Sequence, residues 1–140
     1  ETLFRLYYEE VLAAVRQGGF HVMAHLDFPK RHTGNSCDIP ELVDQILAAM
    51  IENDIVPEIN TSTCDRDVKE CCPDVPILAR WAALGGNRVV VGSDAHATHA
   101  VARHFDEAER VLRETGLNIG FYKDGVFQSA AGSTPAEKAL

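Results

Sequence analysis

The sequence has no long apolar run, and none of its stretches approaches the roughly 20 residues that a membrane-spanning helix needs. It also has little positive charge: 13 Lys and Arg stand against 21 Asp and Glu, for a formal net charge of −8. Without a basic stripe to meet phosphates, neither a nucleic acid nor a membrane is expected as a partner. A small phosphorylated substrate remains compatible with this charge, because it needs only a local pocket.

The sequence also lacks pairs of cysteines at the CxxC spacing that is typical of zinc sites. Cys37, Cys64, Cys71 and Cys72 fit no CxxC zinc pattern. Free thiols in a cytoplasmic protein are the favoured interpretation, with a structural zinc or a disulfide as alternatives. No signal peptide is visible. The chain opens with ETLFRLYYEE, without a methionine and already helical in pattern, so we expect it to be a segment of something longer.

The apolar residues alternate between helical spacing and short continuous runs. Helices are predicted over residues 3–15, 42–50, 77–82 and 105–112, and strands over 20–25, 55–59, 89–91 and 118–122. Asp38 and Glu41 form a capping-box signature before the second helix, and residues 126–128 are expected to extend the last strand into a hairpin. The alternation predicts an α/β domain over residues 1–128, with parallel strands and helical crossovers. The small, polar stretch 129–140 is expected to be a frayed tail.

Ligand-type side chains follow two of the predicted strands. In VVVGSDAHATH, an apolar strand that is expected to be buried on both faces ends at Gly92, and Asp94 and His96 follow, two positions apart. His25 and Asp27 follow an earlier strand with the same spacing, which points both side chains the same way in extended chain. Imidazole and carboxylate are the usual ligands of zinc, manganese or iron, which activate water for hydrolysis. A catalytic triad with Ser93 as nucleophile is disfavoured, because no G-x-S-x-G turn is present.

Charged residues near these strand ends allow two interpretations each. Glu58 lies in an apolar strand and shares a face with Asn60. It belongs either to an inward hydrogen-bonded network or to the groups that orient a ligand imidazole. The basic residues that follow the strands are either surface charges or a phosphate site; they are Lys30, Arg31, Arg66 and Arg103. The remaining histidines are assigned to the surface or to packing; they are His21, His32, His99 and His104.

Three strings resemble successive motifs of the polymerase-and-histidinol-phosphatase (PHP) superfamily, in its histidinol-phosphatase branch. They are GGFHVMAHLDFPKR, EINTST and GSDAH followed by VARHFDEAERVLRETG. The resemblance runs from about Tyr7 to Gly125 and implies a distorted (β/α)7 TIM-like barrel. Up to three zinc, manganese or iron ions would lie at its carboxyl face. Four strands are half of such a barrel, so the chain would be its carboxyl-terminal half.

The resemblance also implies roles for individual residues. His25 matches the histidine of the family's H-x-D motif, and Asp94 and His96 match its last D-x-H pair. These three residues would hold metal, and Asp94 and His96 would be catalytic. Arg31, and with it Arg66 and Arg103, match basic positions and would bind phosphate. The residues expected to support the ligands are Asp27, Glu58 and Asn60.

The implied function is that of a metal-dependent phosphatase acting on L-histidinol phosphate in histidine biosynthesis. The alternatives are another PHP-type hydrolase or nuclease, or a non-catalytic half domain. The family's opening H-x-H pair is absent, so the chain alone is expected to be inactive. It would pair with the missing N-terminal half or with itself. Asp65 stands where the branch usually has a basic residue, and an acid there is expected to weaken phosphate binding.

Overall fold

The computed structural model describes residues 1–130, which form a five-stranded sheet with helices packed on it. Its elements are, in chain order, α1 (Thr2–Gln17), β1 (Val22–Met23), α2 (Lys30–Thr33), α3 (Pro40–Glu52), β2 (Val56–Asn60), α4 (Val75–Ala83), β3 (Arg88–Gly92), the 3-10 helix Thr98–Ala100, α5 (Phe105–Thr115), β4 (Asn118–Lys123) and β5 (Val126–Ser129). No helix among these residues is both long and apolar enough to cross a membrane.

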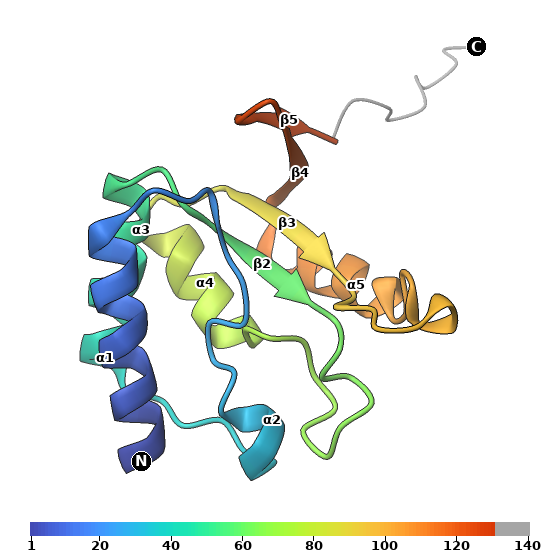
Figure 1. Ribbon diagram of the computed structural model, residues 1–140, viewed down its shortest axis with the longest axis horizontal. Coiled ribbons are helices and arrows are strands. Elements are labelled where there is room, and N and C mark those ends of the chain that lie inside the picture. The colour runs from blue at the N-terminus through green and yellow to red at the C-terminus, as the bar shows by residue number, and fades with distance from the viewer. Residues whose placement is uncertain (131–140) are drawn as a thin grey trace.

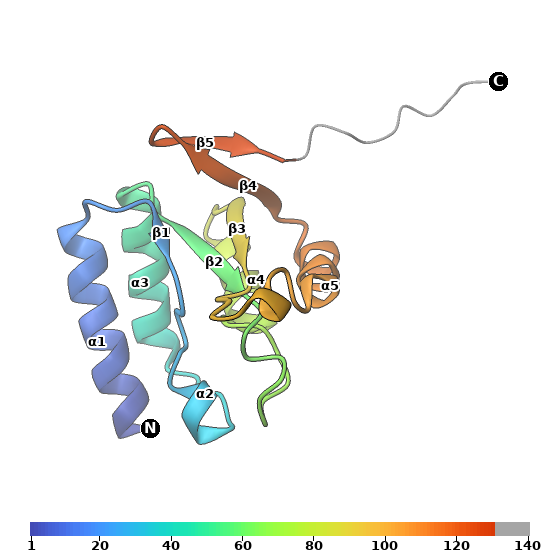
Figure 2. The same ribbon diagram turned by 45° about the vertical axis from the view of Figure 1, so that its right-hand side comes forward.

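The sheet has the order β1-β2-β3-β4-β5. The first four strands are parallel, and β5 returns antiparallel to β4. These four strands lie side by side in the order in which they occur in the sequence. Crossover connections between parallel strands are right-handed, so the connecting helices all lie on one face of the sheet. Figures 1 and 2 show α4 behind β2, with α3 beside it. The predicted α/β class and the parallel strands with helical crossovers are confirmed.

The apolar faces of α1, α3 and α4 make the core, with Val15, Ile46, Leu47 and Leu78 at 0% exposure. The other face of the sheet is only partly covered. Val89 is fully buried on the core side, whereas Val90, which points to the other face, is partly exposed. The expectation of a strand buried on both faces was therefore wrong, since no described element packs over that second face.

Local chain signals explain the ends of the elements. Gly18 and Gly116 end their helices at φ 67° and 68°, a conformation that glycine adopts without strain. The capping box predicted for Asp38 and Glu41 does not form, because α3 begins at Pro40, whose fixed φ and missing N–H suit a first helical position. The predicted hairpin forms, and its two turn residues Asp124 and Gly125 both have positive φ, as a tight hairpin turn requires.

Two predicted segments have different bounds. The first strand is only Val22–Met23, and the following loop contains α2 and the fully buried Lys30. Ser129 ends β5, one residue beyond the predicted boundary at 128. The rest of the predicted tail, residues 131–140, lies outside the described residues.

Candidate metal and phosphate site

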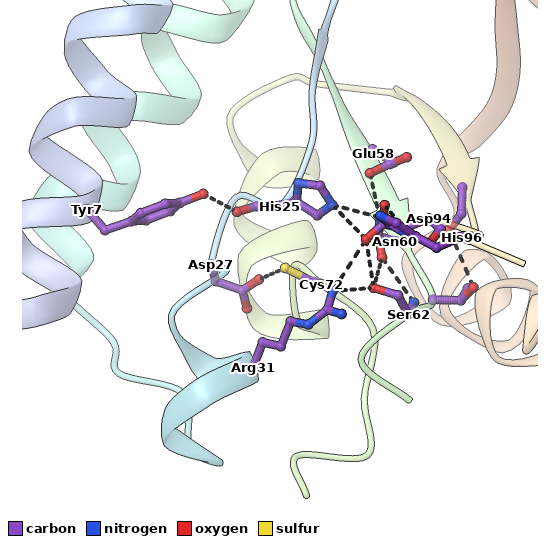
Figure 3. A network of polar contacts seen from close by, with 12 residues as sticks. Tyr7, His25, Asp27, Arg31, Glu58, Asn60, Ser62, Cys72, Asp94 and His96 are labelled. Atoms are coloured by element: carbon purple, nitrogen blue, oxygen red, sulfur yellow. Dashed lines mark hydrogen bonds and ion pairs between the residues drawn. The ribbon is translucent and has the colours of Figure 1, made fainter. Parts of the chain in front are cut away.

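Polar side chains from three neighbouring strands meet at the carboxyl edge of the sheet (Figure 3). His25 follows β1, Asn60 ends β2, and Asp94 follows β3. His25 Nε2 lies 3.6 Å from Asp94 Oδ2 and 3.1 Å from Asn60 Nδ2. The carboxyl ends of parallel strands lie at one edge of the sheet, which is how residues far apart in sequence form this cluster.

Backbone geometry turns two of these side chains out of the strand direction. His25 and Asp94 have φ of 56° and 50°, a left-handed conformation that is uncommon outside glycine and gathers at functional sites. Gly92 gives the cluster room, since a Cβ there would lie 2.1 Å from Glu58 Oε1. Gly92 at the end of β3 therefore leaves space for Glu58, and the turn that follows aims the carboxylate of Asp94.

Asn60 connects the cluster to its supports. Its Nδ2 donates to Glu58 Oε2 at 2.9 Å, and its Oδ1 accepts from the amide and the hydroxyl of Ser62 at 3.0 and 2.7 Å. These bonds fix the amide so that Nδ2 also faces His25 Nε2. That arrangement assigns the proton of a neutral His25 to Nδ1. Glu58 thus reaches His25 through Asn60, which fits both interpretations of this carboxylate.

Arg31 approaches the cluster from α2. Its Nη1 donates to Ser62 Oγ at 3.2 Å and lies 3.3 Å from Asp94 Oδ2. The guanidinium also lies 5.7 Å from the centre of the Phe28 ring, a distance at which cation and ring attract. Arg31 is therefore held beside Asp94 with most of its side chain buried.

Two adjoining clefts open onto this cluster, with volumes of about 490 and 460 Å³. Arg31, Asp94 and His96 line both. The larger cleft is also lined by Arg66 and Arg103, so the structure brings the three predicted phosphate-binding residues to one cavity. The smaller is lined by His25 and by Tyr7, His32 and Phe28. Clefts of this size suit a small molecule.

Asp65 is paired within the larger cleft. It lies 2.9 Å from Arg103 Nη1 and accepts from His104 Nε2 at 2.6 Å. Asp65 was expected to weaken phosphate binding, but the guanidinium of Arg103 offsets its negative charge. His104 was expected at the surface or in packing, and only the folded loops bring it into contact with Asp65.

Tyr7 is a second residue that the sequence did not indicate. Its hydroxyl, on α1, donates to the backbone oxygen of His25 at 2.6 Å. This bond ties the strained residue after β1 to the helix beside it. Its sequence signal is only that of an apolar helix position, so nothing in the pattern distinguishes it from a core residue.

Asp27 does not join the cluster, contrary to the expectation that it would lie beside His25. Its side chain is 1% exposed and lies 2.7 Å from Lys30 Nζ. It also accepts from Cys72 Sγ at 2.7 Å (Figure 3). The left-handed turn at His25 breaks the extended geometry on which the expectation relied. Lys30, interpreted as either a surface charge or part of a phosphate site, is neither exposed nor in the cleft: it is 0% exposed and pairs with Asp27.

His96 is at the edge of the cluster. Its side chain is 83% exposed, its Nδ1 lies 2.7 Å from the backbone oxygen of Asp94, and the same nitrogen lies 3.8 Å from Asp94 Oδ1. Asp94 therefore has one imidazole on each side, His25 and His96. Two imidazoles and a carboxylate are suitable zinc-type ligands. Across residues 1–130, however, no group of three His, Cys, Asp or Glu side chains is close enough to hold an ion by itself.

The fold and the site together define an α/β domain with a polar cluster at the carboxyl edge of a mostly parallel sheet. No known family profile matches the chain. It is 33% identical over 115 residues to a probable histidinol-phosphatase of Thermotoga maritima, covering 81% of this chain and 49% of that protein. Probable histidinol-phosphatases of Deinococcus radiodurans (34% over 114 residues; 81% and 43% covered) and Clostridium acetobutylicum (28% over 138 residues; 93% and 53% covered) match similarly.

The fold is shared with a solved structure. This is the histidinol phosphate phosphatase of Lactococcus lactis in complex with zinc, L-histidinol and phosphate, which matches with a TM-score of 0.72 at 20% identity. The match covers 89% of this chain and 50% of that one. The chain is thus a relative of proteins named probable histidinol-phosphatases, as its motifs predicted. It spans about half the length of the relatives that it matches.

Proposed function

We propose that the chain is one half of a metal-dependent phosphatase domain that hydrolyses L-histidinol phosphate. The observation that carries this proposal is the convergence of His25, Asp94 and Arg31 at the carboxyl edge of the sheet. Side chains of the types that bind metal and phosphate lie together in this cluster, which supports the proposal. The names of the sequence relatives support the substrate, because several are probable histidinol-phosphatases.

The half-barrel architecture is part of this proposal. Four parallel strands in sequential order, with a second sheet face that is only partly buried, suit a barrel that other strands complete. β1 is an edge strand, which needs a neighbour or a cover. We propose that the missing N-terminal half supplies these strands, with self-association of the chain as the alternative.

His25, Asp94 and His96 would hold the metal, with further ligands from outside residues 1–130. Their donor chemistry fits zinc, which the Lactococcus lactis structure contains, and it also fits manganese or iron. A divalent metal lowers the pKa of bound water and offsets negative charge on a phosphate group. The number of ligands that the described residues bring together is too small for a stable site. This is why the isolated chain is expected to be inactive.

The chain's own residues would bind and orient the substrate. Arg31, Arg66 and Arg103 line one cleft and would hold the phosphate group there. Asn60 would position the imidazole of His25 beside Asp94, with Glu58 fixing Asn60 in turn. Asp27 has no place in this scheme, because it is bonded to Lys30 and Cys72.

The substrate class is tested with the complete protein. L-histidinol phosphate and a phosphodiester such as bis-p-nitrophenyl phosphate are compared at the same concentration with added zinc or manganese. Faster release of phosphate from the monoester is the expected result. Preferential cleavage of the diester would favour the other PHP-type hydrolases or nucleases instead.

Replacing Arg31 with methionine tests the phosphate site. Losing a charged hydrogen-bond donor costs about 1.5–3 kcal/mol, so KM for the phosphomonoester is expected to rise roughly 10- to 100-fold. Inhibition by inorganic phosphate should weaken by a similar factor. Arg113→Met, on the exposed side of α5, is the matched control. Equal KM values for the two variants would remove Arg31 from the phosphate site.

A further inference from the structure

Two cysteines face each other across the loop between β2 and α4. We call residues 61–74 the pocket loop, because several of its residues line the larger cleft. Its base is closed by Asn60 and Cys72, which exchange backbone hydrogen bonds of 2.8 and 2.9 Å. Within the loop, Thr63 Oγ1 donates to the backbone oxygen of Glu70 at 2.5 Å. Residues 70–72 are thereby held against residues 60–64.

The sulfur atoms of Cys64 and Cys71 are 3.7 Å apart in this arrangement. A disulfide needs them at about 2 Å, so an approach of under about 2 Å would join them. We propose that Cys64 and Cys71 form a reversible redox-modification site, which closes to an intramolecular disulfide on exposure to a peroxide. Nothing in the proposed phosphatase function is needed for this inference.

The two thiols differ in exposure and in acidity. Cys64 is half-buried, whereas Cys71 is 3% exposed. The sulfur contact with Cys71, helped by nearby His104, lowers the pKa of Cys64. The same contact, followed by burial, raises the pKa of Cys71. Cys64 is therefore the thiolate that meets an oxidant first, since reactivity follows thiolate character and access.

The reaction balances with hydrogen peroxide as oxidant. The Cys64 thiolate attacks one peroxide oxygen, the O–O bond breaks, and the departing hydroxide takes a proton to become water. This leaves a sulfenic acid on Cys64. The Cys71 sulfur then attacks that of Cys64, the S–O bond breaks, and the departing hydroxide leaves as water with the proton of Cys71. Two thiols and one peroxide thus give one disulfide and two waters.

Oxidation of Cys64 also favours the second step, the attack of Cys71 on the oxidised sulfur. A negative charge on Cys64 is among the causes that hold the proton on Cys71. The sulfenic acid is neutral, so this cause disappears once Cys64 has reacted. This eases the second step, in which Cys71, 3.7 Å away, acts as the resolving thiol.

The neighbouring Cys72 does not compete for this role. Its side chain is 0% exposed, its Sγ donates to Asp27 Oδ1 at 2.7 Å, and burial raises its pKa well above the ordinary value. Cys37 lies outside the pocket loop, before α3. The pairing of Cys64 with Cys71 is thus specific among the four cysteines.

The experiment treats the purified chain with increasing hydrogen peroxide, alkylates the remaining thiols and maps the products by mass spectrometry without reduction. Trypsin cuts after Arg66 and Lys69, so a Cys64–Cys71 bond joins two separate peptides. Because Cys37 shares a peptide with Cys64, and Cys72 shares one with Cys71, the digest is repeated on Cys37→Ser and Cys72→Ser. Cys64→Ser and Cys71→Ser are the test variants.

The expected result is one cross-linked peptide pair in wild type and in both control variants. Dithiothreitol should reverse it, and neither test variant should form it. Any one of three results, each seen in the digest of the wild-type chain, would overturn the proposal. They are sulfinic acid on Cys64 without a cross-link, a link that maps to Cys37 or Cys72, and full alkylation of both thiols at a peroxide dose that has already oxidised Cys37.

Discussion

Replacing Asp94 with asparagine is expected to lower kcat/KM for phosphate release by at least about a hundredfold in the complete protein. Asp94 contacts His25 and His96 and lies beside Arg31, so its carboxylate is central to the proposed metal and phosphate site. Loss of even an outer group at a metal site typically costs 10- to 100-fold, and Asp94 is assigned as a ligand itself. Metal content per protein should fall with the activity.

The matched control for this variant is Asp124→Asn. Asp124 has φ 51°, close to the 50° of Asp94, and lies exposed in the hairpin turn between β4 and β5. Asparagine tolerates this backbone conformation well, so neither variant should lose its fold. Near wild-type activity in Asp94→Asn would contradict the ligand assignment, and equal losses in the two variants would point to a structural cause.

Replacing Lys30 with methionine is expected to destabilise the chain by about 3–5 kcal/mol at pH 7. Lys30 is 0% exposed, and its Nζ contacts Asp27 Oδ2 at 2.7 Å and donates to the backbone oxygen of Cys71 at 2.6 Å. The variant leaves the buried Asp27 carboxylate without its cation. Urea unfolding monitored by circular dichroism measures the loss, with the exposed Lys123→Met as control.

The loss should shrink as the pH falls. Burial raises the pKa of Asp27 above its ordinary value, and the charge of Lys30 acts in the opposite direction. Without Lys30 that pKa rises further. A raised pKa in the folded state means that protonation favours folding, so the variant regains stability as the pH drops through that pKa. A deficit that is constant between pH 7 and pH 5 would contradict this account.

A double variant separates the lost charge from lost packing. Asp27→Asn together with Lys30→Met removes both charges and should recover much of the stability, because the cost lies in the unpaired carboxylate. A double variant as unstable as Lys30→Met would show that the aliphatic part of the lysine, or its bond to Cys71, matters more. Either result is read from the same unfolding curves.

The elements of this fold were predictable because their signals are local. Helical spacing, glycine stops and the two-residue turn before Val126 are each set by neighbours in sequence. The polar residues after the strands also predicted where His25 and Asp94 would gather, since parallel strands end at one edge. The partly open sheet face at Val90 was not predictable from an apolar triplet, because burial there depends on what packs against the sheet.

The directions of individual side chains were the least predictable feature. The spacing of His25 and Asp27 implied a common direction, but the left-handed turn at His25 sends them apart. Lys30 looks like a surface lysine until Asp27 is seen beside it in the interior. The contact between Tyr7 and His25 joins a helix to a strand end. Such contacts arise from tertiary packing, and no local pattern encodes them.

The most direct test of the central claim is phosphate release from L-histidinol phosphate by the complete protein, before and after chelation. The account predicts release with bound metal, loss of activity after treatment with EDTA, and recovery on adding zinc or manganese. Undiminished release after the metal has been removed, with metal content measured in the same sample, would contradict a metal-dependent site built on His25, Asp94 and His96.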